Sequence, residues 1–175
     1  MNAKNESTPP PPPPPPAGQR ASTASLASSW IECKGHPVGT VYHREITDGY
    51  QFVILRGPAC ICAYIGVPKA HPLAKIDSYD NLPLSVHGGL TYCGMNGIKE
   101  LEGDWMFWGY DHAHGGDRCF YDSVFRDDNK DTEWTPRAIK DAAWSPLYDF
   151  KKLMGLAEII AARAALTPSA TNEAP

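Results

Sequence analysis

The densest group of side chains capable of chemistry lies between residues 111 and 117, where the sequence reads DHAHGGD. Imidazoles and carboxylates are ligand types that Zn²⁺, Mn²⁺ and Fe²⁺ accept. Without a metal, His114 could act as a base that Asp111 or Asp117 orients. A solvated loop with Asp and Gly in turn positions is the plainer interpretation. We favour a functional site, because histidine is uncommon in such turns.

Two backbone paths would give this segment different sites. If the preceding strand continues, His112 and His114 point to one face and Asp111 to the other, because side chains alternate along a strand. If the chain turns after Tyr110, then Asp111, His114 and Asp117 converge instead. The sequence leaves both paths open.

A second candidate is His87, which is followed by Gly88 and Gly89. Two glycines let the backbone approach a ligand closely or adopt positive φ. We expect His87 to lie at a strand end, held but accessible, as a general base, a metal ligand or a phosphate contact. A tight turn that carries an incidental surface histidine explains the motif equally well.

A third candidate is the stretch GVPKAHPL, residues 66–73, in which Lys69 and His71 could meet an anionic ligand. A rigid loop with exposed polar side chains is the simpler explanation of these residues alone.

The elements that must position these side chains are mostly strands. Strand patterns cover residues 41–46, 50–56, 60–67 and 105–110, with shorter apolar runs at 84–86 and 90–92 on either side of the His87 motif. Asp48-Gly49 predicts a hairpin turn between the first two strands. The runs 50–56 and 60–67 are almost entirely apolar, which predicts central strands. Four prolines predict a long surface loop over residues 68–83.

Helical patterns appear only late in the chain. Thr135-Pro136 and Ser145-Pro146 each combine a helix N-cap with a proline at the first helical position. Between them we expect one short helix, and from Leu147 onward apolar residues recur at helical spacing, at 150, 153, 154, 157, 160 and 164. The sequence therefore predicts an α+β fold, with an antiparallel or mixed sheet and a C-terminal helix packed on one face.

Composition predicts one folded domain between two unstructured segments. Of the 17 prolines, eight form the run Pro9 to Pro16, and residues 1–29 contain little apolar area with which to offset chain entropy. Residues 167–175 have the same character, which leaves 30–166 as a single domain. The proline run prefers the polyproline II helix, and we interpret it as a spacer rather than as a docking ligand.

Charge and cysteine content exclude several classes of protein. The net charge of −4 argues against binding of duplex nucleic acid as the main activity. No apolar run approaches the length of a membrane span. Five cysteines, an odd number without a C-x-x-C pair, argue against a disulfide framework or a structural zinc knuckle. We therefore expect a soluble protein of a reducing compartment.

Residues 66–117 resemble a group of small proteins from bacteriophages and prophages. Three motifs carry the resemblance: G-x-P-x-x-H-P-L, H-G-G-L-T-[YF] and G-[FY]-D-x-x-H-x-G-D, which begin here at Gly66, His87 and Gly109. In such relatives Cys often stands where this chain has His112, which disfavours a zinc site built on the pair His112 and His114. The resemblance implies a phage or prophage origin, the cytoplasm of a bacterial host, and a shared site.

Three functions fit these observations. The first is a small hydrolase, metal-assisted, that acts on a phosphoester or another polar small molecule. The second is a non-catalytic binder that sequesters a nucleotide-type signal or blocks a host defence protein. The third is a small interaction domain whose His/Asp cluster only stabilises loops. The expected catalytic residues are His87, Asp111, His114 and Asp117; a divalent metal would be bound by His87, Asp111 and His114; and Lys69, His71, Gly88, Gly89, Tyr92 and Trp108 would contact the small-molecule ligand.

Overall fold

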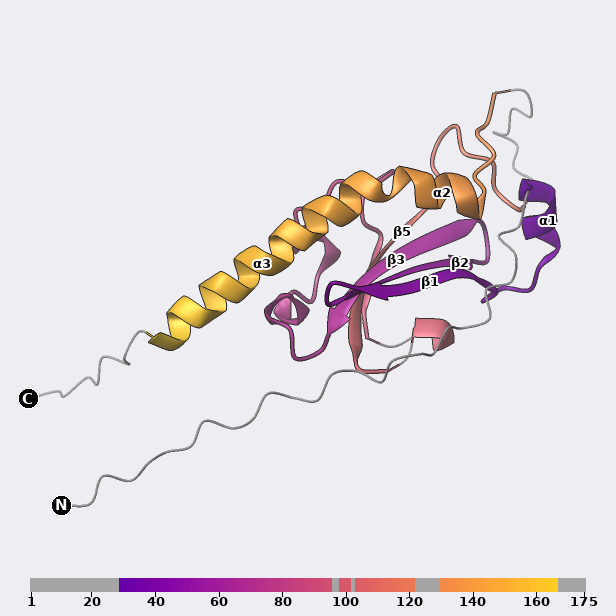
Figure 1. Cartoon of the computed structure of the whole chain (residues 1–175). Coiled ribbons are helices and arrows are strands. Elements are labelled where there is room, and N and C mark those ends of the chain that lie inside the picture. The colour runs from indigo at the N-terminus through magenta and orange to yellow at the C-terminus, as the bar shows by residue number, and fades with distance from the viewer. Residues whose placement is uncertain (1–28, 96–97, 102, 122–129, 167–175) are drawn as a thin grey trace, which may run out of the picture.

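A five-stranded antiparallel sheet forms the centre of the protein (Figure 1). The structure is a computed structural model, and it describes residues 29–95, 98–101, 103–121 and 130–166. The strands are β1 (Val41–Thr47), β2 (Tyr50–Arg56), β3 (Ile61–Pro68), β4 (Tyr92–Gly94) and β5 (Trp105–Asp111), and their order in the sheet is β1-β2-β3-β5-β4. The helices are α1 (Trp30–Gly35), α2 (Pro136–Ala142) and α3 (Trp144–Leu166), with short 3-10 helices η1 (Pro72–Lys75), η2 (Tyr79–Asn81) and η3 (Lys99–Leu101). The predicted α+β fold is confirmed, and its sheet is antiparallel.

The predicted hairpin between β1 and β2 is present. Thr47 pairs with Tyr50, and both turn residues have positive φ, 47° for Asp48 and 82° for Gly49. Positive φ at both central positions is what a tight two-residue hairpin requires. The two predicted central strands, β2 and β3, are buried along almost their whole length.

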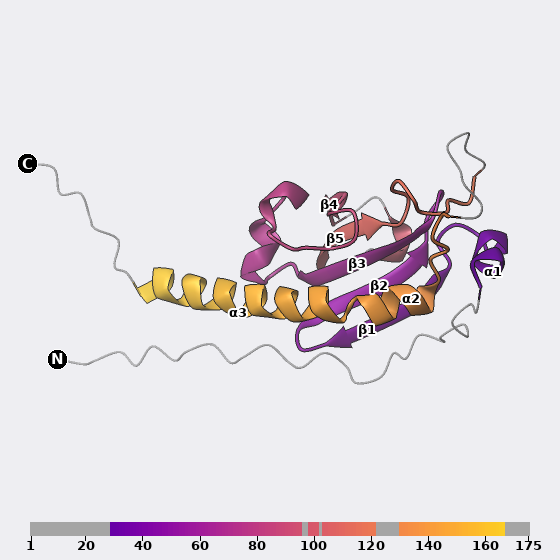
Figure 2. The same cartoon turned by 90° about the horizontal axis from the view of Figure 1, so that it is seen from above.

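The two faces of the sheet bury separate clusters. On one face, Phe52, Ile65 and Trp108 pack with Phe150 and Met154 of α3. On the other face, Val53, Tyr64 and Phe107 pack with Leu101 of η3. Figure 2, seen from above, shows α2 and α3 running along the first face of the sheet. Alternation along each strand therefore supplies both clusters, as the period of two requires.

The chain between β3 and β4 differs from the prediction in two ways. The expected surface loop over 68–83 contains η1 and η2, and its Leu73 and Leu82 are buried in the main core. The run 84–86 is irregular rather than a strand, and a turn follows it at residues 87–88, where the amide of Gly89 donates to the carbonyl of Val86 at 3.1 Å. His87 therefore lies in a loop before β4 rather than at the end of a strand.

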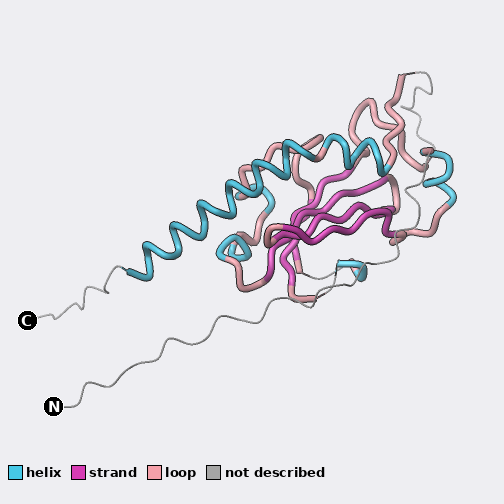
Figure 3. The backbone as a smooth tube through the Cα atoms, viewed as in Figure 1, coloured by secondary structure: helices cyan, strands magenta, loops and turns pink. Residues whose placement is uncertain are grey.

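Both predicted helices are present, and the second is longer than expected. Thr135 caps α2 by accepting a hydrogen bond from the amide of Ala138 at 3.2 Å. Helix α3 begins at Trp144 rather than at Leu147 and continues to Leu166. Its first half packs on the sheet and its second half extends past it (Figure 3). Of the predicted apolar face, Phe150 and Met154 are buried, whereas Ile160 is 59% exposed.

The predicted unstructured segments lie outside the described residues, except for Ser29. Ser29 is the N-cap of α1, and its side chain accepts a hydrogen bond from the amide of Glu32 at 3.2 Å. Among the described helices, none has both the length and the apolar character needed to cross a membrane.

Candidate functional site

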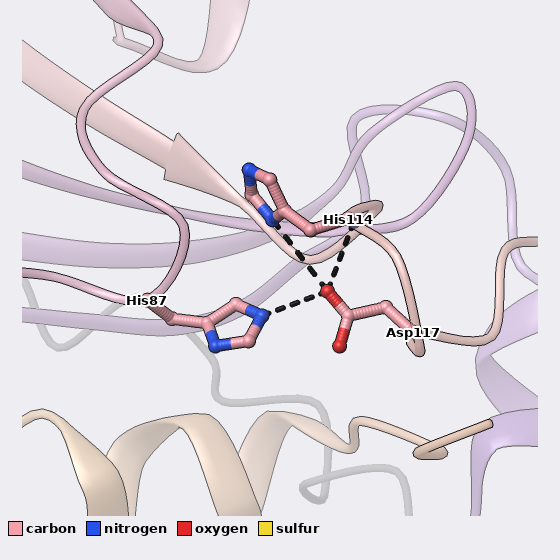
Figure 4. A group of neighbouring side chains, drawn as sticks. All are labelled: His87, His114 and Asp117. Carbon is pink, nitrogen blue, oxygen red and sulfur yellow. Dashed lines mark hydrogen bonds and ion pairs between the residues drawn. The ribbon is translucent and has the colours of Figure 1, made fainter. Parts of the chain in front are cut away.

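The segment that follows β5 turns, so the second of the two predicted backbone paths is the one observed. β5 ends at Asp111, Gly116 has a φ of 90°, and the amide of Asp117 donates to the carbonyl of His114 at 2.9 Å. This turn folds Asp117 back toward His114. Since the loop that contains His87 lies beside it, side chains 30 residues apart in the sequence meet here (Figure 4).

Asp117 is the centre of the cluster. Its Oδ2 lies 2.7 Å from Nε2 of His87 and accepts a hydrogen bond from the amide of His114 at 3.0 Å. Its Oδ1 accepts a hydrogen bond from Nε1 of Trp134 at 2.7 Å. Both carboxylate oxygens of this buried residue therefore have hydrogen-bond partners.

These hydrogen bonds set the ionisation of the cluster. Burial by itself raises the pKa of Asp117, but the hydrogen bonds from His87, Trp134 and the amide of His114 outweigh it, so the pKa lies below the usual 3.8. Asp117 is therefore a carboxylate at neutral pH, which can only accept. His87 must then donate from Nε2, which leaves its Nδ1 available to accept or to carry a second proton.

His114 completes the group and lacks a hydrogen bond at one ring nitrogen. Its Nδ1 lies 3.5 Å from Oδ2 of Asp117 and 3.9 Å from Oδ1 of Asp111, and this buried atom makes no hydrogen bond. Asp111 is held in place by Thr91, whose hydroxyl donates to Oδ2 at 2.9 Å, and by the amide of Ala113, which donates to Oδ1 at 3.1 Å. The predicted convergence of these carboxylates on His114 is confirmed.

His112 has a different role from His114. It is 2% exposed, its Nδ1 lies 3.1 Å from the carbonyl of Ile61, and its ring stacks on that of His87 with centroids 5.0 Å apart. Burial lowers its pKa to about 4, so the ring is neutral at physiological pH and donates from Nδ1. His112 therefore packs against one face of the His87 ring, and it does not form a ligand pair with His114.

Trp134 is a site residue that sequence reasoning missed. Besides its hydrogen bond to Asp117, its ring lies 4.8 Å from that of His87 and 4.7 Å from that of His112. It sits just before the N-cap of α2, far in sequence from the histidine motifs. The only available signal was a tryptophan adjacent to a helix start, which by itself points to no particular site.

The packing of the site requires a glycine at position 88, directly after His87. Its φ is 65°, and a Cβ placed on it would lie only 2.0 Å from the ring of His114. Gly89 also has positive φ, 88°, but a Cβ there would meet no atom within 4 Å. The first glycine is thus required by the packing of the site, and the second only by the turn.

We expect Gly88→Ala to disturb the site more than Gly89→Ala does. Both variants carry the strain of an L-residue at positive φ, on the order of 1 kcal/mol. Only Gly88→Ala must also displace His114, which brings the total to about 2–4 kcal/mol. Urea denaturation of the matched pair measures the difference. Equal losses of stability would show that Gly88 does not contact His114.

The predicted ligand-contacting residues are not all brought to this cluster. Lys69 pairs with Asp104 at 3.7 Å, and Nε2 of His71 lies 3.3 Å from Glu158 of α3. Tyr92 packs edge-on against Tyr64 on the other face of the sheet.

Trp108 is completely buried under α3, beside Phe150. With no exposed surface, Trp108 cannot make the predicted contact with a ligand at this site. The reason is that β5 is an interior strand, so its aromatic side chains fill the two cores instead of facing solvent.

One set of residues in the described part of the chain has the arrangement of a metal site. One ligand atom from each of His87, His114 and Asp117 lies within 4.8 Å of the other two. Asp117 thus takes the place that the sequence had given to Asp111 in the ligand set. About a third of each imidazole side chain is exposed, 34% for His87 and 32% for His114, so the group is reachable from solvent.

Comparison with known proteins adds no family to this description. No family model matches the chain, and neither the curated proteins nor the solved structures include a match. The resemblance to phage and prophage proteins therefore stays a prediction.

Proposed function

We propose that this protein is a small metal-assisted hydrolase whose His87, His114 and Asp117 bind one divalent transition-metal ion. The observation that carries the proposal is the approach of these three ligand atoms to within 4.8 Å of one another. Two imidazoles and one carboxylate form a ligand set suited to Zn²⁺, Mn²⁺ or Fe²⁺. Such an ion, when bound, polarises a substrate oxygen and lowers the pKa of a bound water.

The surroundings of the three residues support this assignment. The buried Nδ1 of His114 makes no hydrogen bond and points at Asp117, as a ligand atom does before its metal is bound (Figure 4). Trp134 holds the second oxygen of Asp117 at 2.7 Å, and His112 supports the ring of His87. Groups that orient the ligands in this way are typical of metal sites.

The substrate class in the proposal is a phosphoester or another small polar molecule. Asp111 lies beside His114 without being one of the three ligands, and it is 30% exposed at its side chain, so it is placed to handle a proton. The phage or prophage setting, in a bacterial cytoplasm, is supported by the sequence motifs alone.

One observation favours a second candidate, acid–base catalysis without a metal. The 2.7 Å separation of His87 Nε2 and Asp117 Oδ2 is a direct hydrogen bond, closer than two ligands of one tetrahedral ion normally stand. A carboxylate that binds one ring nitrogen in this way makes the other nitrogen, here Nδ1, a better base.

Metal analysis of the purified protein, with thermal shifts in ZnCl₂ and MnCl₂, tests the proposal. We expect close to one ion per chain and a melting temperature that rises with metal. His114→Ala should abolish both effects, and it should lower hydrolysis of bis-p-nitrophenyl phosphate by at least about 100-fold. His36→Ala removes a histidine near Tyr42, outside the cluster, and is the matched control.

The outcomes separate the rival functions. No bound metal and no thermal shift would rule out the metal site, and hydrolysis that continues in EDTA would then favour the His87–Asp117 pair. A protein with neither metal nor activity, but with a co-purified nucleotide-type ligand or a captured host defence protein, would favour the binder. If His114→Ala lowers only the melting temperature, the cluster is structural.

A further inference from the structure

The second half of α3 exposes an apolar surface that the fold does not use. After Met154, no residue of the helix up to Leu166 is buried. Leu156, Ile159 and Ile160 are 54%, 58% and 59% exposed. This half of α3 contains no buried residue and, among the described residues, contacts only the neighbouring segment around η1, so it would gain stability from a partner (Figure 1).

A groove runs along this part of the helix. It has a volume of about 430 Å³ and lies between α3 and the chain that contains η1 and η2. Ile76, Leu82 and Pro83 line one wall, and Leu153, Ile160 and Ala164 contribute to the other. Lys75 is its only charged lining residue. Beside the groove, Nε2 of His71 lies 3.3 Å from Oε1 of Glu158 without making a hydrogen bond.

The helix side of the groove has the pattern of a self-pairing helix. Leu153, Ala157, Ile160 and Ala164 are separated by four, three and four residues, which is the seam spacing of a coiled coil. A two-fold axis that passes between Glu158 and Ile159 would bring two copies of α3 together in antiparallel orientation. Leu153 would then face Ala164 of the partner subunit, and Ala157 would face Ile160 of the partner subunit. Every layer would combine a large side chain with a small one, which permits close packing.

The terminal segments of the sequence offer this groove few large apolar side chains. Residues 167–175 contain none, and residues 1–28 contain, besides the prolines, only Leu26 and the initiator Met. The internal segment 122–129 joins the described chain near Asp117, at the end of the sheet where β5 finishes. The groove lies at the other end of the sheet. Its η1 wall follows the end of β3 at Pro68, and Pro68 pairs with Trp105, where β5 begins.

We infer that the protein forms a symmetric dimer in which α3 of each copy lies in the groove of the other. The contact is isologous, because the same residues form the groove and the inserted helix face. Twelve residues line the groove in each copy, about half the number that one partner contributes to an interface of standard size, so the dimer depends on concentration. The His/Asp cluster lies at the opposite end of the sheet and stays open, so the dimer is independent of the proposed function.

Sedimentation equilibrium of the full chain, from low micromolar to near millimolar concentration, tests the dimer. We expect the wild type to pass from monomer to dimer within this range. Ile160→Glu would place two charges in the interface and should weaken dimerisation by at least about 100-fold. Ala162→Glu adds the same charge on the exposed side of the helix away from the groove, and should leave dimerisation unchanged.

An exchange of side-chain size tests the antiparallel register. Ala157→Ile and Ile160→Ala should each weaken the dimer, because one makes two large side chains meet and the other makes two small ones meet. The double variant restores one large and one small side chain per layer and should recover most of the affinity. A monomer at every concentration, a dimer indifferent to Ile160→Glu, or a double variant no better than the singles would each overturn the proposal.

Discussion

Replacing Asp117 with Asn is expected to lower the free energy of unfolding by about 3 kcal/mol and to abolish the proposed metal binding. The reason lies in the three donors that surround the carboxylate: the His87 ring, the Trp134 indole and the amide of His114. Asn keeps the shape of Asp but replaces one acceptor oxygen with an NH₂ group.

Neither orientation of the new amide satisfies the site. If its oxygen faces Trp134, its NH₂ group faces the amide of His114, which can only donate. If the amide is turned over, its NH₂ group faces the indole N–H, which also can only donate. Either way a buried donor loses its partner, and this is costlier than the loss of a hydrogen bond in water.

Asp111→Asn is the matched control for Asp117→Asn. It removes the same charge from a neighbouring position, but Asp111 is 30% exposed and solvent can replace its partners. We expect Asp111→Asn to lower the free energy of unfolding by less than about 1 kcal/mol in urea denaturation. For Asp117→Asn we expect about 3 kcal/mol, which corresponds to a fall of about 10 °C in melting temperature. If the two variants lose equal stability, Asp117 is not the centre of the cluster.

The second large effect is a loss of stability on mild acidification, caused by His112. In the folded protein burial lowers the pKa of this imidazole from 6.5 to about 4, with a further lowering by His87 that Asp117 and Asp111 oppose. Between these two pH values the unfolded chain binds a proton that the folded chain does not, so stability falls as the pH falls. The loss of unfolding free energy caused by His112 is about 3 kcal/mol in full, and it is reached near pH 4.

Urea denaturation of the EDTA-treated protein between pH 7.5 and pH 4 measures this effect. His112→Phe keeps a flat ring stacked on His87 but cannot titrate, so its stability should depend less on pH over this window. The variant should be less stable by about 1–2 kcal/mol at pH 7.5, because the carbonyl of Ile61 loses its donor.

Other groups in the protein also titrate, but they are present in both wild type and His112→Phe, so the difference between the two pH profiles reports on His112. Burial also lowers the pKa of His43, which therefore adds to the acid sensitivity of both proteins. The pKa of Asp117 lies below 3.8, so the stability that this carboxylate contributes is lost only at lower pH. Parallel pH profiles for wild type and His112→Phe would contradict the assignment of a buried, neutral His112.

The sequence alone determined the fold class and singled out His87, His114 and Asp117 as candidates for a site, but not Trp134. Strand alternation, the Asp48-Gly49 turn and the caps of the late helices are local signals, since each depends on residues that are neighbours in the chain. The same holds for the DHAHGGD turn, whose residues were grouped correctly because they are only a few positions apart.

Only the tertiary structure decided which residues meet across long separations. It placed Trp134 on Asp117 and the carbonyl of Ile61 on His112, and it put Trp108 in the core. These contacts depend on strand order and on which sheet face α3 covers, and periodicity within one segment contains no information about either. The same limit applies to α3, whose apolar spacing predicts a packed face throughout, although the sheet beneath it ends before the helix does.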